Sequence, residues 1–518
     1  MNTQSQLAYS ADRANQYIAE NKGTVNPLYR NRYHASPPVG WMNDPNGFVQ
    51  FQGAYHLFYQ FHPYDAKWGP MHWGHMKSTD LIHWEDLPVA LAPDQAYDRS
   101  GCFSGSAIER DGKLYLLYTG VTEANEEGVH HQVQCLAVSE DGVNFEKVQQ
   151  NPVIPVAALP ADASQIDFRD PKVFEHEGMY YTVVASKAGD ETGQILLDQS
   201  ADLVEWEFAS VFLKGNKEQG IMWECPDFFR LNGKDCLIFS PMQWPQDGDD
   251  YQNLNASVLA VGEVDWATKQ FHPESYQELD HGLDYYAPQS LEDDKGRRIC
   301  IGWMQMWGRN FPTDTLGHNW TGSMTIPREL KWEDGKLKQY PIGIEAIADN
   351  QGENSPVITM ADTKESIPGI AGDCGLLTLK VDTSGLEKLS IHLRENENER
   401  TIVYYDKAKN ELGIDRSASG IELKGEEAHP PVSRKVTLSG KSDHLELAIY
   451  LDSSSVEVFE KNGEVVMTSN VYPTAAAKRY LRKRLLRPLS DREFRFFGTN
   501  NCNRKETLCG EFILLEKY

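Results

Sequence analysis

Polar and apolar residues alternate along most of this chain in short runs, and one such run recurs five times. In each copy a polar residue and a glycine lead into a stretch of aromatic, β-branched or aliphatic residues, which is the signal of a β-hairpin. The turn glycines, spaced 55 to 66 residues apart, are Gly53, Gly112, Gly178, Gly233 and Gly296. The pattern therefore predicts a repeated unit of several strands.

A second motif interleaves with the first and has the same period. It reads Ser-x-Asp with an aromatic residue six positions after the serine, and it begins at Ser78, Ser139 and Ser200, 61 residues apart each time. A repeat of about sixty residues with several strands per unit is typical of a propeller blade. We predict five blades between about residues 33 and 332.

The chain after the fifth repeat has a different pattern. Strict alternation at Leu445–Leu451 and Ser455–Phe459, with a turn at Asn462-Gly463, is typical of an antiparallel sandwich. We therefore predict an all-β protein in which a five-bladed β-propeller is followed by a C-terminal β-sandwich. The predicted segments are an N-terminal extension (1–32), the propeller (33–335), a linker (336–344) and the sandwich (345–518).

One position of the repeat carries reactive side chains. Eight or nine residues before the turn glycines stand Asp44, Ser104, Asp170, Glu224 and Pro288. The fifth of these lies between Tyr286 and Gln289. Equivalent points of all blades face the same end of a propeller axis, so we expect three carboxylates from remote parts of the sequence to converge there.

The amino-acid composition limits the classes of molecule that the protein is expected to bind. The 518 residues include 50 basic and 76 acidic side chains, a net charge of −26, which disfavours nucleic acid and anionic membranes as partners. No apolar run is long enough to span a bilayer, and residues 1–23 lack the apolar segment of a signal peptide, so we expect a cytoplasmic protein.

The eight cysteines form no Cys-x-x-Cys pair, so we expect reduced thiols rather than disulfides or a zinc site. His72 and His75 supply only two metal ligands, and we expect no metal. Six basic residues gather between Lys478 and Arg487, which we interpret as a solvated edge or an ion-paired contact rather than a nucleic-acid patch.

Two of the carboxylates suit glycosidic bond cleavage, which needs one ionised nucleophile and one protonated acid. Amide donors at Asn43 and Asn46 would keep Asp44 ionised. Glu224 lies in Met222-Trp223-Glu224-Cys225-Pro226, where apolar or weakly polar neighbours would partly desolvate it and favour its protonated form. Asp170 follows Arg169, and this dipeptide by itself indicates no more than an ion pair.

Aromatic residues are dense around these positions, as in a pocket where a sugar stacks its C–H faces. They are Trp41, Trp68, Trp73, Phe103, Trp223, Trp303 and Trp307. The side chains that would meet sugar hydroxyls are Asn43, Gln60, Ser104 and Gln289.

Taken together, the motifs resemble glycoside hydrolase family 32, the invertase and β-fructofuranosidase group. Residues 41–47 resemble its nucleophile motif, residues 103–105 its fructose-binding motif, residues 169–171 its transition-state motif and residues 224–226 its acid/base motif. Residues 454–459 are similar to its C-terminal sandwich signature. The resemblance spans both predicted domains.

The resemblance implies a retaining β-fructofuranosidase of the intracellular bacterial sucrase type that needs no cofactor. It implies that Asp44 is the nucleophile, Glu224 the acid/base and Asp170 the transition-state stabiliser. The substrate-binding residues that it implies are Trp41, Asn43, Gln60, Trp68, Phe103, Ser104, Arg169, Cys225, Tyr286 and Trp303.

Several alternatives stay open. The substrate is sucrose or a short fructo-oligosaccharide, sucrose 6-phosphate, or a fructan cleaved from its end. The acidic composition favours unphosphorylated sugars. Other readings are an inverting five-bladed hydrolase, transfer of fructose to another sugar, and a propeller that binds sugar without catalysis. We expect a monomer or homodimer.

Overall fold

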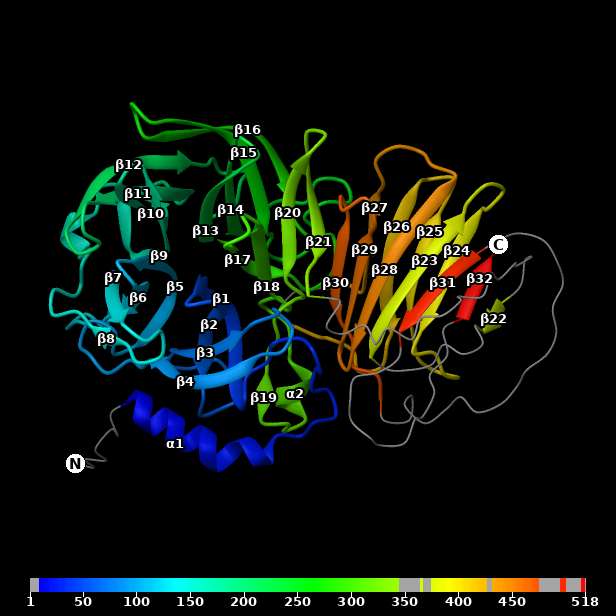
Figure 1. The fold of residues 1–518 in the computed structure, drawn as a ribbon, viewed down its shortest axis with the longest axis horizontal. Coiled ribbons are helices and arrows are strands. Elements are labelled where there is room, and N and C mark those ends of the chain that lie inside the picture. The colour runs from blue at the N-terminus through cyan, green and yellow to red at the C-terminus, as the bar shows by residue number, and fades with distance from the viewer. Residues whose placement is uncertain are drawn as a thin grey trace.

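The structure is a computed structural model that describes residues 9–343, 364–366, 374–425, 431–474, 494–499 and 514–517. Five sheets of the N-terminal part radiate around an axis, and two further sheets stack beside them (Figure 1). The predicted all-β fold, a propeller followed by a sandwich, is confirmed. The basic run at 478–487 lies outside the described residues.

Each blade is built from four antiparallel strands. Blade 1 contains β1 (Gly40–Phe51), β2 (Ala54–His62), β3 (His72–Ser78) and β4 (Glu85–Leu91). Blade 2 contains β5 (Gly101–Arg110), β6 (Lys113–Val121), β7 (Gln132–Ser139) and β8 (Glu146–Lys147). Blade 3 contains β9 (Ala163–His176), β10 (Met179–Ala188), β11 (Gly193–Ser200) and β12 (Trp206–Lys214).

The last two blades complete the circle. Blade 4 contains β13 (Met222–Leu231), β14 (Lys234–Met242), β15 (Val258–Asp265) and β16 (Gln270–Glu278). Blade 5 contains β17 (Tyr286–Glu292), β18 (Arg298–Trp303), β20 (Arg328–Glu333) and β21 (Lys336–Pro341). The first strands of the blades contact one another in the ring β1, β5, β9, β13, β17 and back to β1. These five inner strands therefore surround the axis.

Every pair of neighbouring blades encloses its own hydrophobic cluster. Phe48 and Ile301, for example, belong to one cluster between blades 5 and 1, and Val183 and Phe228 belong to another between blades 3 and 4. Each blade is apolar on both faces because it packs against two neighbours. The hydrophobic core of the propeller therefore lies between neighbouring blades.

The fifth blade extends further than the sequence analysis expected. β21 covers Lys336–Pro341, most of the predicted linker, and pairs with β20 as the outer strand. We therefore propose that the propeller ends near residue 341 rather than 335. The other predicted boundaries stay predictions.

Three short segments and one insertion decorate the propeller. Helix α1 (Ala11–Asn21) lies against β4, and η1 (Lys22–Thr24) and η2 (Val156–Ala158) are single 3₁₀ turns. Between β18 and β20 the chain forms α2 (Pro312–Thr315) and β19 (Trp320–Thr321), and β19 pairs in parallel with β1. Among the described residues, no helix is long and apolar enough to cross a membrane.

The second domain is a sandwich of two antiparallel sheets, yellow to red in Figure 1. One sheet has the order β22 (Lys364–Ser366), β32 (Leu514–Lys517), β24 (Lys388–Leu393), β25 (Arg400–Asp406), β26 (Glu411–Ala418), β27 (Ser433–Thr437). The other has the order β30 (Val466–Asn470), β29 (Ser455–Glu460), β28 (His444–Asp452), β23 (Gly375–Asp382), β31 (Phe494–Thr499). Residues such as Leu379, Ile391 and Val458 fill the space between them.

Buried ion pairs join the two domains. Glu457, within the sandwich signature, accepts from Arg328 of blade 5 at 2.9 Å and from His34 at 2.8 Å, and all three side chains are fully buried. His34 also contacts Asp452 at 2.9 Å. A buried charge without its partner is costly, so these residues fix how the sandwich sits on the propeller.

Candidate active site

A β-bulge interrupts each inner strand at the repeat position that carries the reactive residues. The register shifts within 42–45, 103–105, 169–172, 224–227 and 286–289. Asp170, Cys225 and Ala287 adopt positive φ angles of 64°, 50° and 50° there. Because a bulge bends its strand and redirects a side chain, five bulges at one end of the axis turn the side chains of five blades toward a common point.

Asp44 comes from the bulge of blade 1 and is held by two donors. Its Oδ2 accepts a hydrogen bond from Ser104 Oγ at 2.7 Å, and its Oδ1 accepts one from Asn43 Nδ2 at 2.9 Å. Trp41 Nε1 in turn donates to Asn43 Oδ1 at 2.7 Å. Trp41 therefore orients the amide that orients the carboxylate.

Burial raises the pKa of Asp44 above its ordinary value, although the hydrogen bonds from Ser104 and Asn43 lower it, and the charge of Glu224 raises it further. The sequence predicts an ionised Asp44, held by the amides of Asn43 and Asn46 and by backbone N–H groups of the turn. The structure shows two opposing influences, because the donors compensate only part of the desolvation.

Both carboxylate oxygens of Glu224 in blade 4 accept hydrogen bonds. Arg169 donates to Oε1 from Nε at 3.1 Å and from Nη2 at 2.8 Å, and Tyr286 donates to Oε2 at 2.5 Å. Of the neighbours expected to desolvate Glu224, Trp223 packs elsewhere, because its ring stacks on Phe239 in the cluster between blades 3 and 4. Alternation along β13 sends the two side chains to opposite faces.

Asp170 and Asp44 meet at Cys225. The Cys225 backbone N–H donates to Asp170 Oδ2 at 3.0 Å, and its sulfur lies 3.6 Å from that oxygen and 3.7 Å from Asp44 Oδ2. Cys225 follows Glu224 in the chain, so the structure brings all three predicted carboxylates together.

Burial raises the pKa of Asp170 to about 7, against the lowering influence of Arg169, and the charges of Glu224 and Asp44 add to the increase. Arg169 does not simply pair with its neighbour Asp170. It reaches Glu224 in the next blade and Asp167 at 3.2 Å, and the surrounding carboxylates, Glu224 first, outweigh burial and raise its pKa. The guanidinium of Arg169 thus offsets part of the negative charge of the surrounding carboxylates.

Aromatic side chains form one wall of the site. Trp41 lies 6.0 Å from Trp303, 5.8 Å from Trp307 and 4.9 Å from Phe311, measured between ring centroids. Among the described residues, the buried indole Nε1 of Trp303 has no hydrogen-bond partner. Trp68 is half exposed and meets Phe103 edge to face at 6.1 Å. This wall has apolar faces and an available donor, which are the features that a sugar ring uses.

Some predicted sugar contacts have other partners. Gln289 accepts from Phe48 N at 2.8 Å and donates to Gly105 O at 3.0 Å, so it ties blade 5 to blades 1 and 2. Gln60 Nε2 donates to Cys102 O at 3.0 Å. Each group of the Gln289 amide thus has a protein partner, and its contact with a sugar stays a prediction.

Sequence reasoning missed two residues that shape this site. Thr119 Oγ1 accepts from the Asp170 backbone N–H at 2.9 Å and so supports the bulge of blade 3. Phe311 closes the aromatic wall from the insertion between β18 and β20. Phe311 lies outside the sixty-residue repeat, so no repeat position could have found it.

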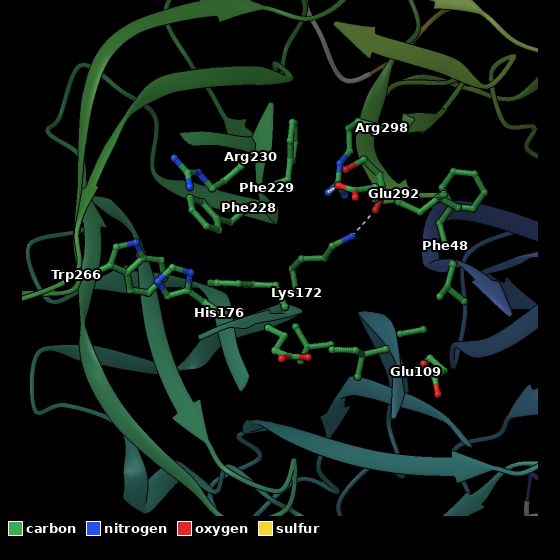
Figure 2. A pocket seen from close by; sticks show the side chains of 18 residues that line it. Phe48, Glu109, Lys172, His176, Phe228, Phe229, Arg230, Trp266, Glu292 and Arg298 are labelled. Atoms are coloured by element: carbon green, nitrogen blue, oxygen red, sulfur yellow. Dashed lines mark hydrogen bonds and ion pairs between the residues drawn. The ribbon is translucent and has the colours of Figure 1, made fainter. Parts of the chain in front are cut away.

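A second hollow opens at the other end of the axis, with a volume of about 340 Å³ (Figure 2). Most of its lining residues follow the site residues along the inner strands, and Lys172 reaches into its centre. Lys172 Nζ donates to Ser290 O at 2.5 Å and lies 3.3 Å from Asp227. This hollow contains none of the three carboxylates, so we assign the chemistry to the opposite mouth.

Within the described residues, one group has the spacing of metal ligands: Asp250, Glu278 and His281. Arg434 donates to both Glu278 oxygens at 2.9 Å. Burial lowers the pKa of His281, but the carboxylates of Asp250 and Glu278 outweigh it and raise that pKa to about 9. Arg434 and His281 therefore neutralise the carboxylates that would otherwise bind a metal ion. We interpret the group as an ionic cluster.

Family models match nearly the whole chain. The model of the glycosyl hydrolases family 32 N-terminal domain matches residues 34–341, and that of the family's C-terminal domain matches residues 344–482. A sucrose-6-phosphate hydrolase of Escherichia coli is 39% identical over 477 residues, covering 91% of this chain and 94% of that protein. A raffinose invertase of Escherichia coli is 37% identical over 450 residues, covering 86% and 90%.

Solved structures share the fold. A mutant of a Bombyx mori GH32 β-fructofuranosidase, in complex with sucrose, matches 98% of this chain and 97% of its own, with 33% identity and a TM-score of 0.79. The two-domain architecture thus has relatives of known structure.

Proposed function

Because this chain belongs to glycosyl hydrolase family 32, and is a glycoside hydrolase as its motifs indicate, we propose that it is a retaining β-fructofuranosidase. It hydrolyses terminal non-reducing β-D-fructofuranosides such as sucrose and short fructo-oligosaccharides. The observation that carries this proposal is the convergence of Asp44, Asp170 and Glu224 around Cys225.

In the first step Asp44 attacks the anomeric carbon of the fructosyl unit while Glu224 gives a proton to the leaving oxygen. The carbon–oxygen bond breaks with its electrons on that oxygen, and a covalent fructosyl-enzyme forms. In the second step Glu224 takes a proton from water, which attacks the same carbon and releases Asp44. Asp170 holds hydroxyls of the sugar and stabilises the positive charge of the transition state.

The other predicted contacts complete the pocket. Asn43 and Ser104 orient Asp44, Trp41 and Trp303 form its wall, and Trp68 and Phe103 form the outer edge where a leaving sugar would sit. We propose no cofactor, a cytoplasmic location, and a monomer or homodimer.

Sucrose 6-phosphate is the second candidate substrate, because several relatives bear the name sucrose-6-phosphate hydrolase. Against it, Arg169 beside the carboxylates is already paired with Glu224 and Asp167. A phosphate would need cations from the outer loops. We therefore place the neutral sugars first.

A substrate panel tests the proposal. The purified protein is given sucrose, sucrose 6-phosphate, 1-kestose, inulin and levan, and kcat/KM is compared, with maltose as a glycoside that lacks fructose. We expect release of glucose from sucrose and no action on maltose. Turnover of the phosphorylated sugar alone would reverse our order of substrates. Binding of fructosides without any cleavage would support the non-catalytic alternative, and sugar products longer than the substrate at high sucrose would indicate transfer.

A further inference from the structure

Tyr286 lies between the acid/base residue and a backbone carbonyl. It begins β17, its side chain is 1% exposed, and its hydroxyl lies 2.5 Å from Glu224 Oε2 and 3.1 Å from the carbonyl oxygen of Ser240. Ser240 is the residue of β14 that faces Glu224 across the strand pair. The family resemblance implies that Tyr286 binds fructose, whereas its hydroxyl has these two protein partners.

A phenol has one proton, so it can donate to only one of these oxygens at a time. Burial, with the Glu224 charge as the next cause, raises the pKa of Tyr286 well above its usual range, so this proton stays on the phenol. The Ser240 carbonyl can only accept. The Glu224 oxygen accepts when the carboxylate is ionised and donates when it is protonated.

The other oxygen of Glu224 is not available for the proton. Arg169 directs two N–H groups at Oε1, at 3.1 and 2.8 Å, and a proton placed there would face two donors. The acid form of Glu224 therefore carries its proton on Oε2, next to the Tyr286 oxygen.

We propose that Tyr286 is a positioning residue whose hydroxyl turns between Ser240 and Glu224 as Glu224 gains and loses its catalytic proton. When Glu224 is protonated, Oε2 donates to the Tyr286 oxygen and the phenol donates to Ser240. When the proton passes from Oε2 to the leaving oxygen of the substrate, the phenol turns and donates to Oε2. No proton leaves Tyr286, and the hydrogen bonds of all three groups are satisfied in both states.

This movement favours the departure of the proton. The hydrogen bond from the phenol to a carboxylate is stronger than the one to a carbonyl, so stabilisation grows as the charge on Glu224 develops. The same bond holds the carboxylate ready to act as base in the second step. Loss of the hydroxyl therefore weakens the ionised form of Glu224 more than the protonated form.

The inference rests on the proposed function and is tested by pH profiles of sucrose hydrolysis. In Tyr286→Phe we expect the alkaline limb of kcat/KM to move to higher pH by about one unit. We also expect a burst of glucose ahead of fructose, because the base-dependent second step slows. Tyr285→Phe is the matched control, since it removes a buried phenol one residue away that contacts Cys300 Sγ at 3.7 Å. Its alkaline limb should coincide with that of the unmodified enzyme.

A second variant covers the case in which Tyr286→Phe does not fold. Incorporation of 3-fluorotyrosine at position 286 keeps the hydroxyl but makes it a stronger donor, so the alkaline limb should move to lower pH. Shifts of opposite sign in the two variants would support the inference. An unchanged limb in either folded variant, or the same shift in Tyr285→Phe, would overturn it. An unmodified enzyme that cleaves no fructoside would instead refute the proposed function.

Discussion

The two ends of the propeller axis are lined by the same five strands, yet their charges are organised differently. At the active-site mouth, Asp44, Asp170 and Glu224 lie together, Arg169 pairs with Glu224, and burial raises the pKa of Asp44 and Asp170. At the rear hollow, Lys172 is paired with Asp227. At the mouth the carboxylates therefore outnumber the cation, whereas Lys172 and Asp227 in the rear hollow form a pair of opposite charges.

This difference in charge indicates that the mouth serves catalysis and that the rear hollow contributes to stability. Like charges forced together in a buried site cost folding free energy, and this arrangement is typical of groups that must change protonation. A buried pair with an additional hydrogen bond, such as Lys172 with Asp227 and Ser290 O, holds three blades together instead. Substitutions at the two ends should therefore separate activity from stability.

The largest effect is expected from the nucleophile. Asp44→Asn should lower kcat for sucrose by about 10⁴-fold or more, since no fructosyl-enzyme can form on an amide. The melting temperature should not fall, because a desolvated carboxylate is removed and Asn still accepts from Ser104. Initial rates and thermal unfolding measure both. Asp65→Asn, at an exposed loop position, is the control and should stay within about twofold in kcat. Residual activity above one part in a hundred would contradict the assignment of Asp44.

The rear hollow should respond in the opposite way. Lys172→Met leaves Asp227 as a buried charge without its cation, so the free energy of unfolding should fall by about 3 to 5 kcal/mol. Urea unfolding measures the loss, and kcat/KM of the remaining folded protein should change little. The double variant Lys172→Met/Asp227→Asn should recover most of the stability, because an amide keeps the acceptor for Ser290 N. A large loss of kcat with normal stability would break the comparison.

The smallest expected change in stability is a gain at the active-site mouth. Asp170→Asn should raise the melting temperature at pH 8 by roughly 2 to 5 °C while abolishing most activity. Burial raises the pKa of Asp170 to about 7, above its value in an unfolded chain, so wild-type stability falls as pH rises from about 4 to 7. The difference between variant and wild type should therefore vanish below about pH 4. Asn also tolerates the positive φ of 64° at this position. A variant that is equally destabilised at every pH would refute this account.

Much of the site could be predicted from the repeat, because equivalent positions of a repeat occupy equivalent places in the blades. A position eight or nine residues before each turn glycine falls on the bulge of each inner strand, so Asp44, Asp170 and Glu224 could be placed together without the structure. The repeat did not indicate the protein partners of Gln289. It lies one residue past the repeat position, and its amide bonds to Phe48 N and Gly105 O.

Hydrophobic alternation and turn residues act over a few positions, so the sequence was enough to predict the all-β class, the five blades, the sandwich and the three carboxylates. Which charges face one another is visible in the folded structure alone. Arg169 grips Glu224 in the next blade rather than its neighbour Asp170, and the hydroxyl of Tyr286 lies on Glu224. Phe311 joins the wall from an insertion without a repeat. Such contacts link residues far apart in the chain, and their energies depend on burial and distance, which no local pattern records.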